Sequence, residues 1–219
     1  MSEVQKVIAI DGPSASGKGT IASRVAGILG FDYLDSGALY RLTALYAQKQ
    51  QVEWTDEAAV ARLAEHLPVQ FDGQTILLAG ENVSEQIRSE AIGMGASAVA
   101  QLPLVRAALL QRQRDFLTEK GLVADGRDIG SVIFPDARLK IFLTASAQVR
   151  AERRAKQIGL PCEGVEFERI LSDIEARDEA DRRRAVAPLQ QLPDAMLLDT
   201  TKLTIEETVK KVLDWYSKV

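Results

Sequence analysis

The chain of 219 residues lacks the features of a secreted or membrane protein. It has a single cysteine, Cys162, so no internal disulfide can form and nothing indicates an oxidising compartment. Its first ten residues, MSEVQKVIAI, have no charged segment followed by the long apolar stretch of a signal peptide. No apolar run approaches the roughly 20 residues that a membrane span needs. We therefore expect a soluble, cytoplasmic protein with no membrane partner.

A strong charge of either sign is also missing. The formal net charge is −4, which does not favour a general attraction to nucleic acid. The arginines are nevertheless concentrated in one segment: Arg150, Arg153, Arg154, Arg169, Arg177, Arg182, Arg183 and Arg184. Local arginine in an acidic chain suits small phosphates better than a long polyanion. The only histidine, His66, is expected to have a structural role in a helix.

Short apolar runs alternate with segments of helical periodicity. Residues 6–10, KVIAI, are branched, apolar and bounded by turn residues, which is typical of a buried strand. Further buried strands are predicted at 121–126, 139–145 and 195–200, and a short strand at FDYLDS ends at Ser36, a candidate helix cap. One helical face is predicted to hold Ile21, Val25, Ile28 and Leu29, and a last helix to begin near Ile205. This alternation predicts an α/β fold with a parallel sheet covered by helices on both faces.

Two regions interrupt the alternation. Residues 60–100 contain a helix and then two apolar runs separated by Asp72-Gly73, a pattern that predicts a β-hairpin. We interpret this region as a small accessory insert in a single domain, whose core is 1–60 and 101–219. Residues 155–168, AKQIGLPCEGVEFE, place glycine and proline between two helices and are expected to form a mobile lid.

The segment IAIDGPSASGKGT, residues 8–20, predicts a phosphate site. A strand, a glycine-rich turn with a lysine and then a helix is the context in which this pattern is specific. Gly12 and Gly17 would let the backbone approach phosphate oxygens, and successive N–H groups at the start of a helix attract anions. Lys18 would add a point charge for the β- and γ-phosphates of ATP. A purely structural strand-to-helix turn would need neither Lys18 nor the run of small residues.

Gly19 stands where many phosphate loops carry a serine or threonine. That hydroxyl usually binds Mg²⁺. We therefore expect the ion to be held mainly by ATP phosphates and water, with Thr20 near the end of the loop and no protein residue assigned as a metal ligand. The form G-x-x-x-x-G-K-G-T resembles the loop of nucleoside monophosphate kinases.

Five motifs make the resemblance closer: DGPSASGKGT, DSGALYR, ADGRDIGSVIFPDA, RDEADRRRAVAPL and LLDTT. In order and spacing, over residues 8–200, they resemble the bacterial cytidylate kinase family. The resemblance implies a three-layer P-loop fold with a small nucleotide-binding insert and a lid. It also implies an enzyme of pyrimidine nucleotide metabolism, which transfers the γ-phosphoryl group of ATP to CMP or dCMP with Mg²⁺ bound to the ATP.

The same resemblance implies the site residues. Lys18, Arg127 and Arg184 would carry the chemistry by stabilising charge. ATP would be bound by Gly12, Pro13, Ser14, Ala15, Ser16, Gly17, Lys18, Gly19 and Thr20, with Arg153 and Arg154 from the lid. The acceptor would be bound by Ser14, Ser36, Arg41, Ser97, Arg106, Arg127, Asp128, Arg177, Asp181 and Arg184.

Within that acceptor set, the family assigns the phosphate to Ser14 and three arginines, Arg41, Arg127 and Arg184. It assigns the sugar hydroxyls to Arg177 and Asp181. Local chemistry leaves alternatives open. Spacings of four and three residues place Arg177, Asp181 and Arg184 on one helical face, where taken alone they would be surface ion pairs.

For the base, the family implies Ser97, Arg106 and Asp128, with Ser89 close enough in sequence to be an alternative to Ser97. A carboxylate at Asp128 can accept from the amino group of cytosine but would face a carbonyl of uracil. Asp128 could instead cap the turn after its strand. We assign it no role as a general base, because the attacking phosphate oxygen is already ionised.

Two other classes of protein fit the loop less well. A small-metabolite kinase, such as one for shikimate, would lack a base pocket and the 40-residue insert before Arg106. A nucleotide-dependent switch would need a hydroxyl after Lys18 and an N-K-x-D segment, and the sequence has neither. We expect a monomer whose partners are ATP and CMP or dCMP.

Overall fold

The computed structural model describes residues 5–72 and 75–219. It divides into two compact units: the first comprises residues 1–34 with 116–219, and the second comprises residues 35–115. The second unit contains the accessory insert expected at about 60–100; the division into core, insert and lid stays a prediction. Within the described ranges, no single helix is long and apolar enough to cross a membrane. A pair of helices bent by 101°, α4 and α5, meets that test only when the two are joined.

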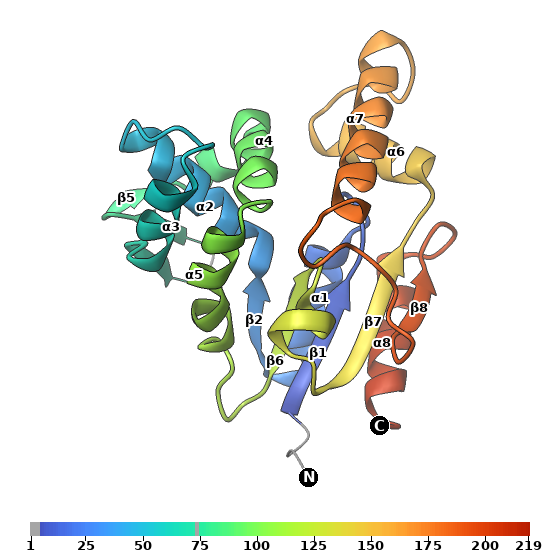
Figure 1. Cartoon of the computed structure of the whole chain (residues 1–219). Helices are drawn as coiled ribbons and strands as arrows, with labels where there is room; N and C mark the ends of the chain where they lie inside the picture. The colour runs from blue at the N-terminus through green and yellow to red at the C-terminus, as the bar shows by residue number, and fades with distance from the viewer. Residues whose placement is uncertain (1–4, 73–74) are drawn as a thin grey trace. The chain divides into compact units, whose positions relative to one another are not determined.

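A five-stranded sheet forms the centre of the first unit (Figure 1). Its order is β2 (Asp32–Asp35), β6 (Leu122–Gly126), β1 (Gln5–Asp11), β7 (Ala137–Thr144) and β8 (Met196–Asp199). β1 pairs in parallel with β6 and β7, and β7 with β8. The predicted parallel sheet and its strands are confirmed. β8 was expected to be buried, which is wrong, because it is an edge strand and Leu197 is 53% exposed.

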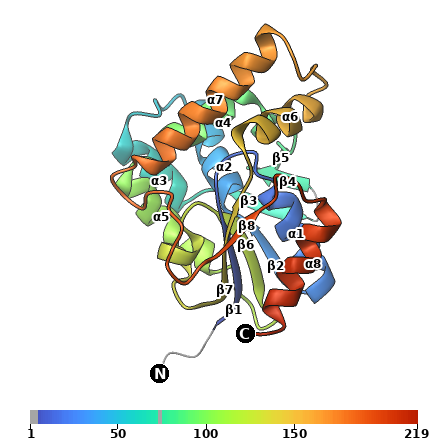
Figure 2. The same cartoon turned by 90° about the vertical axis from the view of Figure 1, so that its right-hand side faces the viewer.

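Helices α1 (Lys18–Leu29) and α8 (Ile205–Tyr216) pack together on one face of this sheet. The short π-helical turn η2 (Ile129–Ile133) lies against the opposite face (Figures 1 and 2). The face of α1 toward the sheet holds Ile21, Ala22, Val25 and Ala26. Ile28 was predicted on this face but is 63% exposed. It lies about 90° around the helix from the centre of the buried stripe, given 100° per residue.

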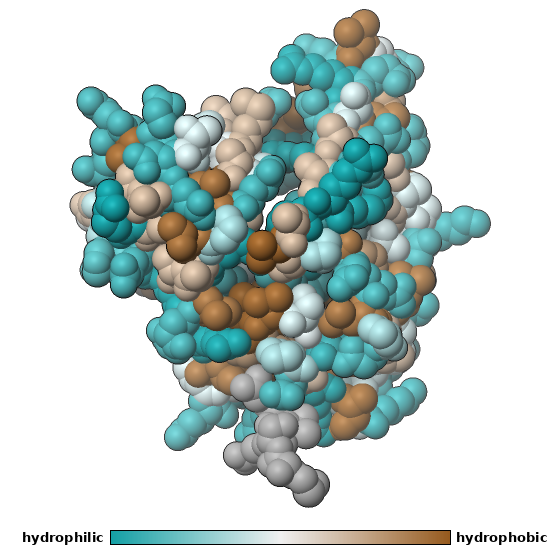
Figure 3. Space-filling view, viewed as in Figure 1, coloured by the Kyte–Doolittle hydropathy of each residue, from teal (hydrophilic) through white to brown (hydrophobic). Residues whose placement is uncertain are grey.

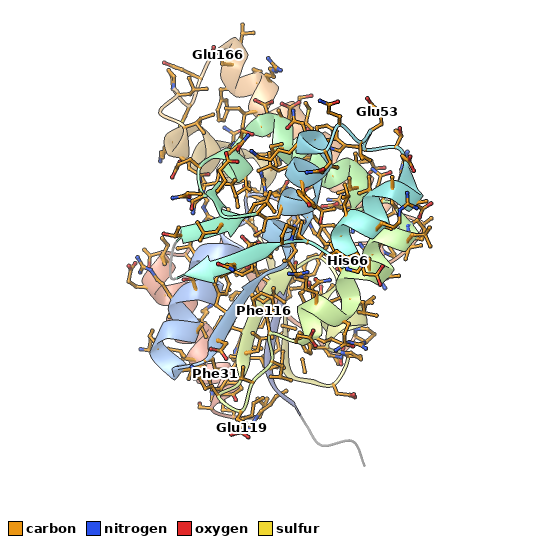
Figure 4. The ribbon with its side chains drawn as sticks, turned by 90° about the vertical axis from the view of Figure 1, so that its left-hand side faces the viewer. Phe31, Glu53, His66, Phe116, Glu119 and Glu166 are labelled. Carbon is orange, nitrogen blue, oxygen red and sulfur yellow. The ribbon has the colours of Figure 1, made fainter. Side chains whose placement is uncertain are left out.

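A pair of helices, α6 (Ala147–Gln157) and α7 (Val165–Arg182), follows β7. They pack through a small apolar cluster that includes Ala151, Ala155 and Phe167. Most of the α7 surface seen in Figure 3 is hydrophilic. Glu166, labelled in Figure 4, lies in the first turn of α7 at the outer end of the pair. The loop 158–164 between the two helices falls within the predicted lid, whose motion stays a prediction.

The second unit combines helices with a small antiparallel sheet. The hairpin of β3 (Val69–Asp72) and β4 (Thr75–Leu78) is confirmed as antiparallel, and β5 (Glu81–Asn82) extends it. The predicted turn at Asp72-Gly73 includes Gly73, which lies outside the described residues. The helical segments are α2 (Ser36–Lys49), α3 (Glu57–Glu65), η1 (Gln86–Arg88), α4 (Glu90–Val99) and α5 (Pro103–Arg114).

Two details of the second unit differ from expectation. The residue that caps α2 is Asp35 and not Ser36: the Asp35 carboxylate accepts the Ala38 N–H at 3.0 Å, and Ser36 is the first helical residue. The Asp35 backbone is extended, which is the conformation a capping residue needs. His66 is exposed and follows the last residue of α3 rather than lying within it (Figure 4).

Candidate active site

The glycine-rich loop joins the end of β1 to the start of α1, as the sequence predicts. Gly12 lies directly against β7: a Cβ atom there would come within 2.0 Å of the Leu143 carbonyl oxygen. Gly17 has a left-handed backbone (φ 93°) immediately before α1, a conformation that glycine adopts without strain. These two constraints fold the loop back over the N-terminus of α1. The N–H groups of that helix end have no partners within the helix and attract anions.

The Lys18 side chain is buried beneath this loop. Its Nζ donates to the Pro13 carbonyl oxygen at 2.8 Å. The pKa of Lys18 is lowered to about 7, mainly by burial and then by the charge of Arg127, although the charges of Asp125, Asp11 and Asp181 act in the opposite direction. A lysine in this position gains its full charge when an anion enters the loop.

Two hydroxyl groups of the loop have hydrogen-bonding capacity to spare for a ligand. Ser14 Oγ and Ser16 Oγ are both buried, and neither has a hydrogen-bond partner in the part of the chain that the structure describes. Buried polar groups are paired in the great majority of native structures. Unpaired hydroxyls in the loop that contains Lys18 therefore fit a phosphate-binding role.

Asp181 joins two of the predicted catalytic arginines. Arg127 Nε donates to Asp181 Oδ2 at 2.6 Å, and Arg184 Nη2 donates to Asp181 Oδ1. Although burial acts to raise it, the pKa of the Asp181 carboxyl is lowered by both arginines. In this structure Asp181 therefore orients Arg127 and Arg184, whereas the sequence assigned it to the sugar.

The position of Arg184 corrects a second expectation. The sequence placed it on the helix, but α7 ends at Arg182 and Arg184 lies two residues beyond. It nevertheless reaches Asp181 because the chain turns back at the helix end: the Leu189 N–H donates to the Asp181 carbonyl oxygen at 2.9 Å. The Arg184 side chain is only 7% exposed as a result.

Further arginines add to the positive charge. Burial lowers the pKa of Arg177, and the positive charges of Arg127 and Arg154 lower it further. The Arg127 and Arg154 guanidinium groups therefore lie close enough to Arg177 to repel it. Arg153 donates to the Ser16 carbonyl oxygen at 3.1 Å and to Thr200 Oγ1 and O. It thus connects α6 to the phosphate loop. Arg154, half-buried on the same helix, donates to Gln157 Oε1 at 3.2 Å.

The end of the loop has a carboxylate that suits Mg²⁺. A Cβ at Gly19 would lie 3.3 Å from Tyr33 Oη and 3.9 Å from Asp125 Oδ1, and the Tyr33 hydroxyl donates to Asp125 at 2.8 Å. A carboxylate therefore lies beside the position that carries a hydroxyl in other loops. Mg²⁺ is commonly held by one or two carboxylates, waters and substrate phosphates, so Asp125 fits a magnesium–ATP complex. Among the described residues no group of three acidic, histidine or cysteine side chains could hold a metal alone.

Asp128 follows β6 and begins the η2 turn. It is only 5% exposed. It occupies the capping position of η2, yet within the described structure its side chain makes no capping hydrogen bond. The turn is capped by Asp11, whose Oδ1 and Oδ2 accept the N–H groups of Ile129 and Gly130, both at 2.8 Å. The alternative of a capping role for Asp128 is therefore wrong.

Four predicted acceptor residues belong to the second unit. Ser36 is buried at the start of α2. Arg41 donates to the Ile87 carbonyl oxygen at 2.9 Å, and the buried Arg106 donates to the Ala100 carbonyl oxygen at 3.3 Å. Ser97 is exposed on α4 and donates back to Gly93 O at 3.1 Å, whereas its alternative, Ser89, caps α4. Ser89 thus has a structural role already.

The sequence assigned no role to four charged side chains of the first unit, although Arg150 was noted in the arginine-rich segment. Asp11 is the last residue of β1 and Asp125 the last but one of the adjacent β6, and Arg150 and Asp178 form a buried ion pair between α6 and α7. Arg150 also donates to the carbonyl oxygens of Ala145 and Ser14. A signal existed for the two aspartates, because ligands of parallel sheets bind beyond the carboxyl ends of the strands. Nothing in the local sequence distinguishes Arg150 or Asp178 from solvent-exposed charges.

Comparison with known proteins agrees with this geometry. The family model described as cytidylate kinase matches residues 8–218. The chain belongs to the cytidylate kinase family. A cytidylate kinase of Neisseria meningitidis serogroup C is 78% identical over 215 residues, covering 98% of this chain and 99% of the relative. A cytidylate kinase of Chromobacterium violaceum is 59% identical over 212 residues, covering 97% and 96%.

Solved structures support the fold class of this cytidylate kinase family member. The crystal structure of an uncharacterized protein from Eubacterium ventriosum aligns with a TM-score of 0.55 at 11% identity, covering 98% of this chain and 100% of that one. At that identity the likeness concerns the fold alone. It agrees with the central parallel sheet flanked by helices.

Proposed function

We propose that this chain transfers the γ-phosphoryl group of ATP to CMP or dCMP, giving ADP with CDP or dCDP. The observation that carries the proposal is the phosphate loop, with its unpaired Ser14 and Ser16 hydroxyls and buried Lys18, in a member of the cytidylate kinase family. Kinases of nucleoside monophosphates take ATP as donor. The remaining site residues are those that the family resemblance implies.

The donor phosphates bind in the loop Gly12–Thr20. Backbone N–H groups at the start of α1 and the Lys18 ammonium supply positive charge, and the Ser14 and Ser16 hydroxyls gain partners. Arg153 and Arg154 reach the donor from α6. Bound Mg²⁺, held by ATP phosphates, water and the Asp125 carboxylate, would neutralise charge on the transferring group.

The transfer step depends on positioning and charge. The phosphoryl group carries negative charge on its equatorial oxygens, and Lys18, Arg127 and Arg184 stabilise it. Asp181 holds the two arginines in one orientation, which lowers the reorganisation needed when substrates bind. No general base is required, because the attacking phosphate oxygen is ionised at neutral pH.

The acceptor is assigned to the side chains that the family resemblance implies. Ser14 and Arg41 bind its phosphate together with Arg127 and Arg184, and Arg177 and Asp181 bind the sugar hydroxyls. Ser36 belongs to the same acceptor set. Ser97, Arg106 and Asp128 contact the base. The insert at about 60–100 contributes Ser97 to nucleotide binding, residues 155–168 form the lid, and the enzyme acts as a monomer.

The experiment is a substitution that leaves the donor site untouched. Asp128→Asn keeps the size of the side chain but can turn an NH₂ group toward a carbonyl. For CMP, kcat/KM should fall by about 10- to 150-fold, which corresponds to one hydrogen bond to a charged group, about 1.5–3 kcal/mol. For UMP it should fall less or rise, so the ratio of kcat/KM for CMP over UMP drops.

Two controls interpret that measurement. Asp136→Asn removes a carboxylate from an exposed position before β7 and should leave kcat/KM unchanged for both CMP and UMP. Lys18→Ala should remove most turnover with every acceptor, since it removes a charge from the transferring group. Equal losses for CMP and UMP in Asp128→Asn would contradict a role in base recognition. A wild-type chain inactive with ATP and CMP would overturn the proposed function.

A further inference from the structure

Asp11 is a charged side chain for which the transfer step provides no role. It is the last residue of β1, next to Gly12 of the phosphate loop, and its backbone pairs with Gly126 of β6 and Phe142 of β7. Its side chain is 7% exposed. A carboxylate so placed needs partners, because burial of an unpaired charge is strongly unfavourable.

The partners of Asp11 are two N–H groups of the η2 turn. Each carboxylate oxygen accepts one of them, Oδ1 from Ile129 and Oδ2 from Gly130, both at 2.8 Å. These bonds join residues 118 and 119 positions apart in the chain. Gly130 lies close to the Lys140 and Asp11 side chains: an added Cβ would lie 3.2 Å from Lys140 Cδ and 3.5 Å from Asp11 Oδ2.

The turn held in this way begins directly after two proposed ligands of the acceptor. Asp128 precedes Ile129, and Arg127 precedes Asp128. The Asp11 carboxylate therefore connects the start of the phosphate loop to the segment that contains Arg127 and Asp128. Two parallel charge-assisted bonds fix orientation as well as distance.

We propose that Asp11 is a positioning residue for acceptor recognition, whose carboxylate holds the Arg127–Asp128 segment in register with the phosphate loop. The proposal rests on the proposed function, because it takes Asp128 and Arg127 to bind the acceptor. It predicts that weakening the Asp11 hydrogen bonds changes KM and kcat/KM for CMP far more than the affinity for ATP.

Asp11→Asn is the test variant. The amide keeps one acceptor oxygen but turns an NH₂ group toward one of the two N–H donors, so one bond is lost. We expect KM for CMP to rise and kcat/KM for CMP to fall by about 10- to 150-fold, the range for one hydrogen bond to a charged group. The dissociation constant of a non-hydrolysable ATP analogue, titrated without acceptor, should change less than threefold. The preference for CMP over UMP should fall, because Asp128 is no longer fixed.

A general loss of stability would not change KM for CMP or the preference for CMP over UMP. Thr204→Ala is the matched control for such a loss. It removes the capping box of α8, in the same unit, without touching β1 or η2. Both variants are assayed well below their melting temperatures. If Asp11→Asn resembles Thr204→Ala, with an unchanged KM for CMP and an unchanged CMP preference, the positioning role is overturned. Equal weakening of ATP and CMP binding would overturn it too.

Amide hydrogen exchange on the wild type keeps the proposal testable if Asp11→Asn fails to fold. The N–H groups of Ile129 and Gly130 should be protected in the free protein, at a level comparable with the strand amides of β6. Rapid exchange there would overturn the proposal. Failure of the proposed function is separate: it appears as a wild type inactive with ATP and CMP, whereas failure of the Asp11 proposal leaves wild-type activity intact.

Discussion

The buried ion pair of Arg150 and Asp178 offers the clearest quantitative prediction for stability. Arg150 Nη1 and Nη2 donate to Asp178 Oδ1 and Oδ2 at 3.1 and 2.5 Å, and the two side chains are 5% and 3% exposed. The guanidinium also donates to the carbonyl oxygens of Ala145 and Ser14 at 2.9 and 3.0 Å. This single pair ties α6 and α7 to the end of β7 and to the phosphate loop.

Asp178→Ala removes the acceptor and leaves the guanidinium buried without a counter-charge. Breaking such a pair costs about 3–5 kcal/mol. A protein of 150–250 residues loses about 2–4 °C of melting temperature per kcal/mol, so Tm should fall by about 6–20 °C. Arg150→Ala should cost less, because Arg182 Nη2 lies 3.9 Å from Asp178 Oδ2 and the carboxylate keeps a partly solvated partner.

Urea unfolding and thermal scans of wild type, both single variants and Arg150→Met/Asp178→Leu measure these effects. The double variant replaces both charges by apolar groups and should be more stable than Asp178→Ala, since no unpaired charge is left. Turnover of the double variant should still fall, because the contact with the Ser14 carbonyl is lost. A loss below about 1 kcal/mol in Asp178→Ala would refute the reasoning, because that is the size of a solvent-exposed pair.

Two further predictions concern ligand binding. ATP binding at pH 8 should take up a proton, because burial holds the pKa of free Lys18 at about 7 and bound phosphates raise it. Calorimetry in buffers of different ionisation enthalpy measures the uptake; its absence, or its persistence in Lys18→Met, would contradict the assignment. Amide exchange in the loop 158–164 should slow when an ATP analogue and CMP are both present, with β1 as the unchanged reference. Equal exchange with and without ligands would argue against a lid.

The phosphate loop could be predicted from the sequence because its requirements are local. A buried strand, two glycines, a lysine and a helix start each depend on residues within about a dozen positions. The position of a strand within the sheet could not be predicted from local sequence in the same way. The segments of β7 and β8 are both apolar, yet β8 lies at the edge and exposes Leu197, which depends on the strand order and not on the segment itself.

Local signals also failed where two adjacent residues could serve the same purpose. Asp35 and Ser36 are both good helix caps, and the backbone conformation at the end of β2 decides in favour of Asp35. Ile28 belongs to an apolar helical pattern, but the buried face of α1 is set by the sheet beneath it. Small rotations of a helix are not encoded in the spacing of its apolar residues alone.

The charges of the active site were the hardest to predict, because their partners are distant in sequence. Spacing alone made Arg177, Asp181 and Arg184 a helical face, whereas the structure pairs Asp181 with Arg127, 54 positions away. Asp11 finds its partners 118 and 119 positions away, and Arg150 reaches Ser14 over 136. A buried carboxylate cannot be told from an exposed one until such partners are known. Because strand ends gather these segments at one edge of the sheet, a charged residue that closes a buried parallel strand is a candidate for such a long-range bond, even where its neighbours in sequence offer it nothing.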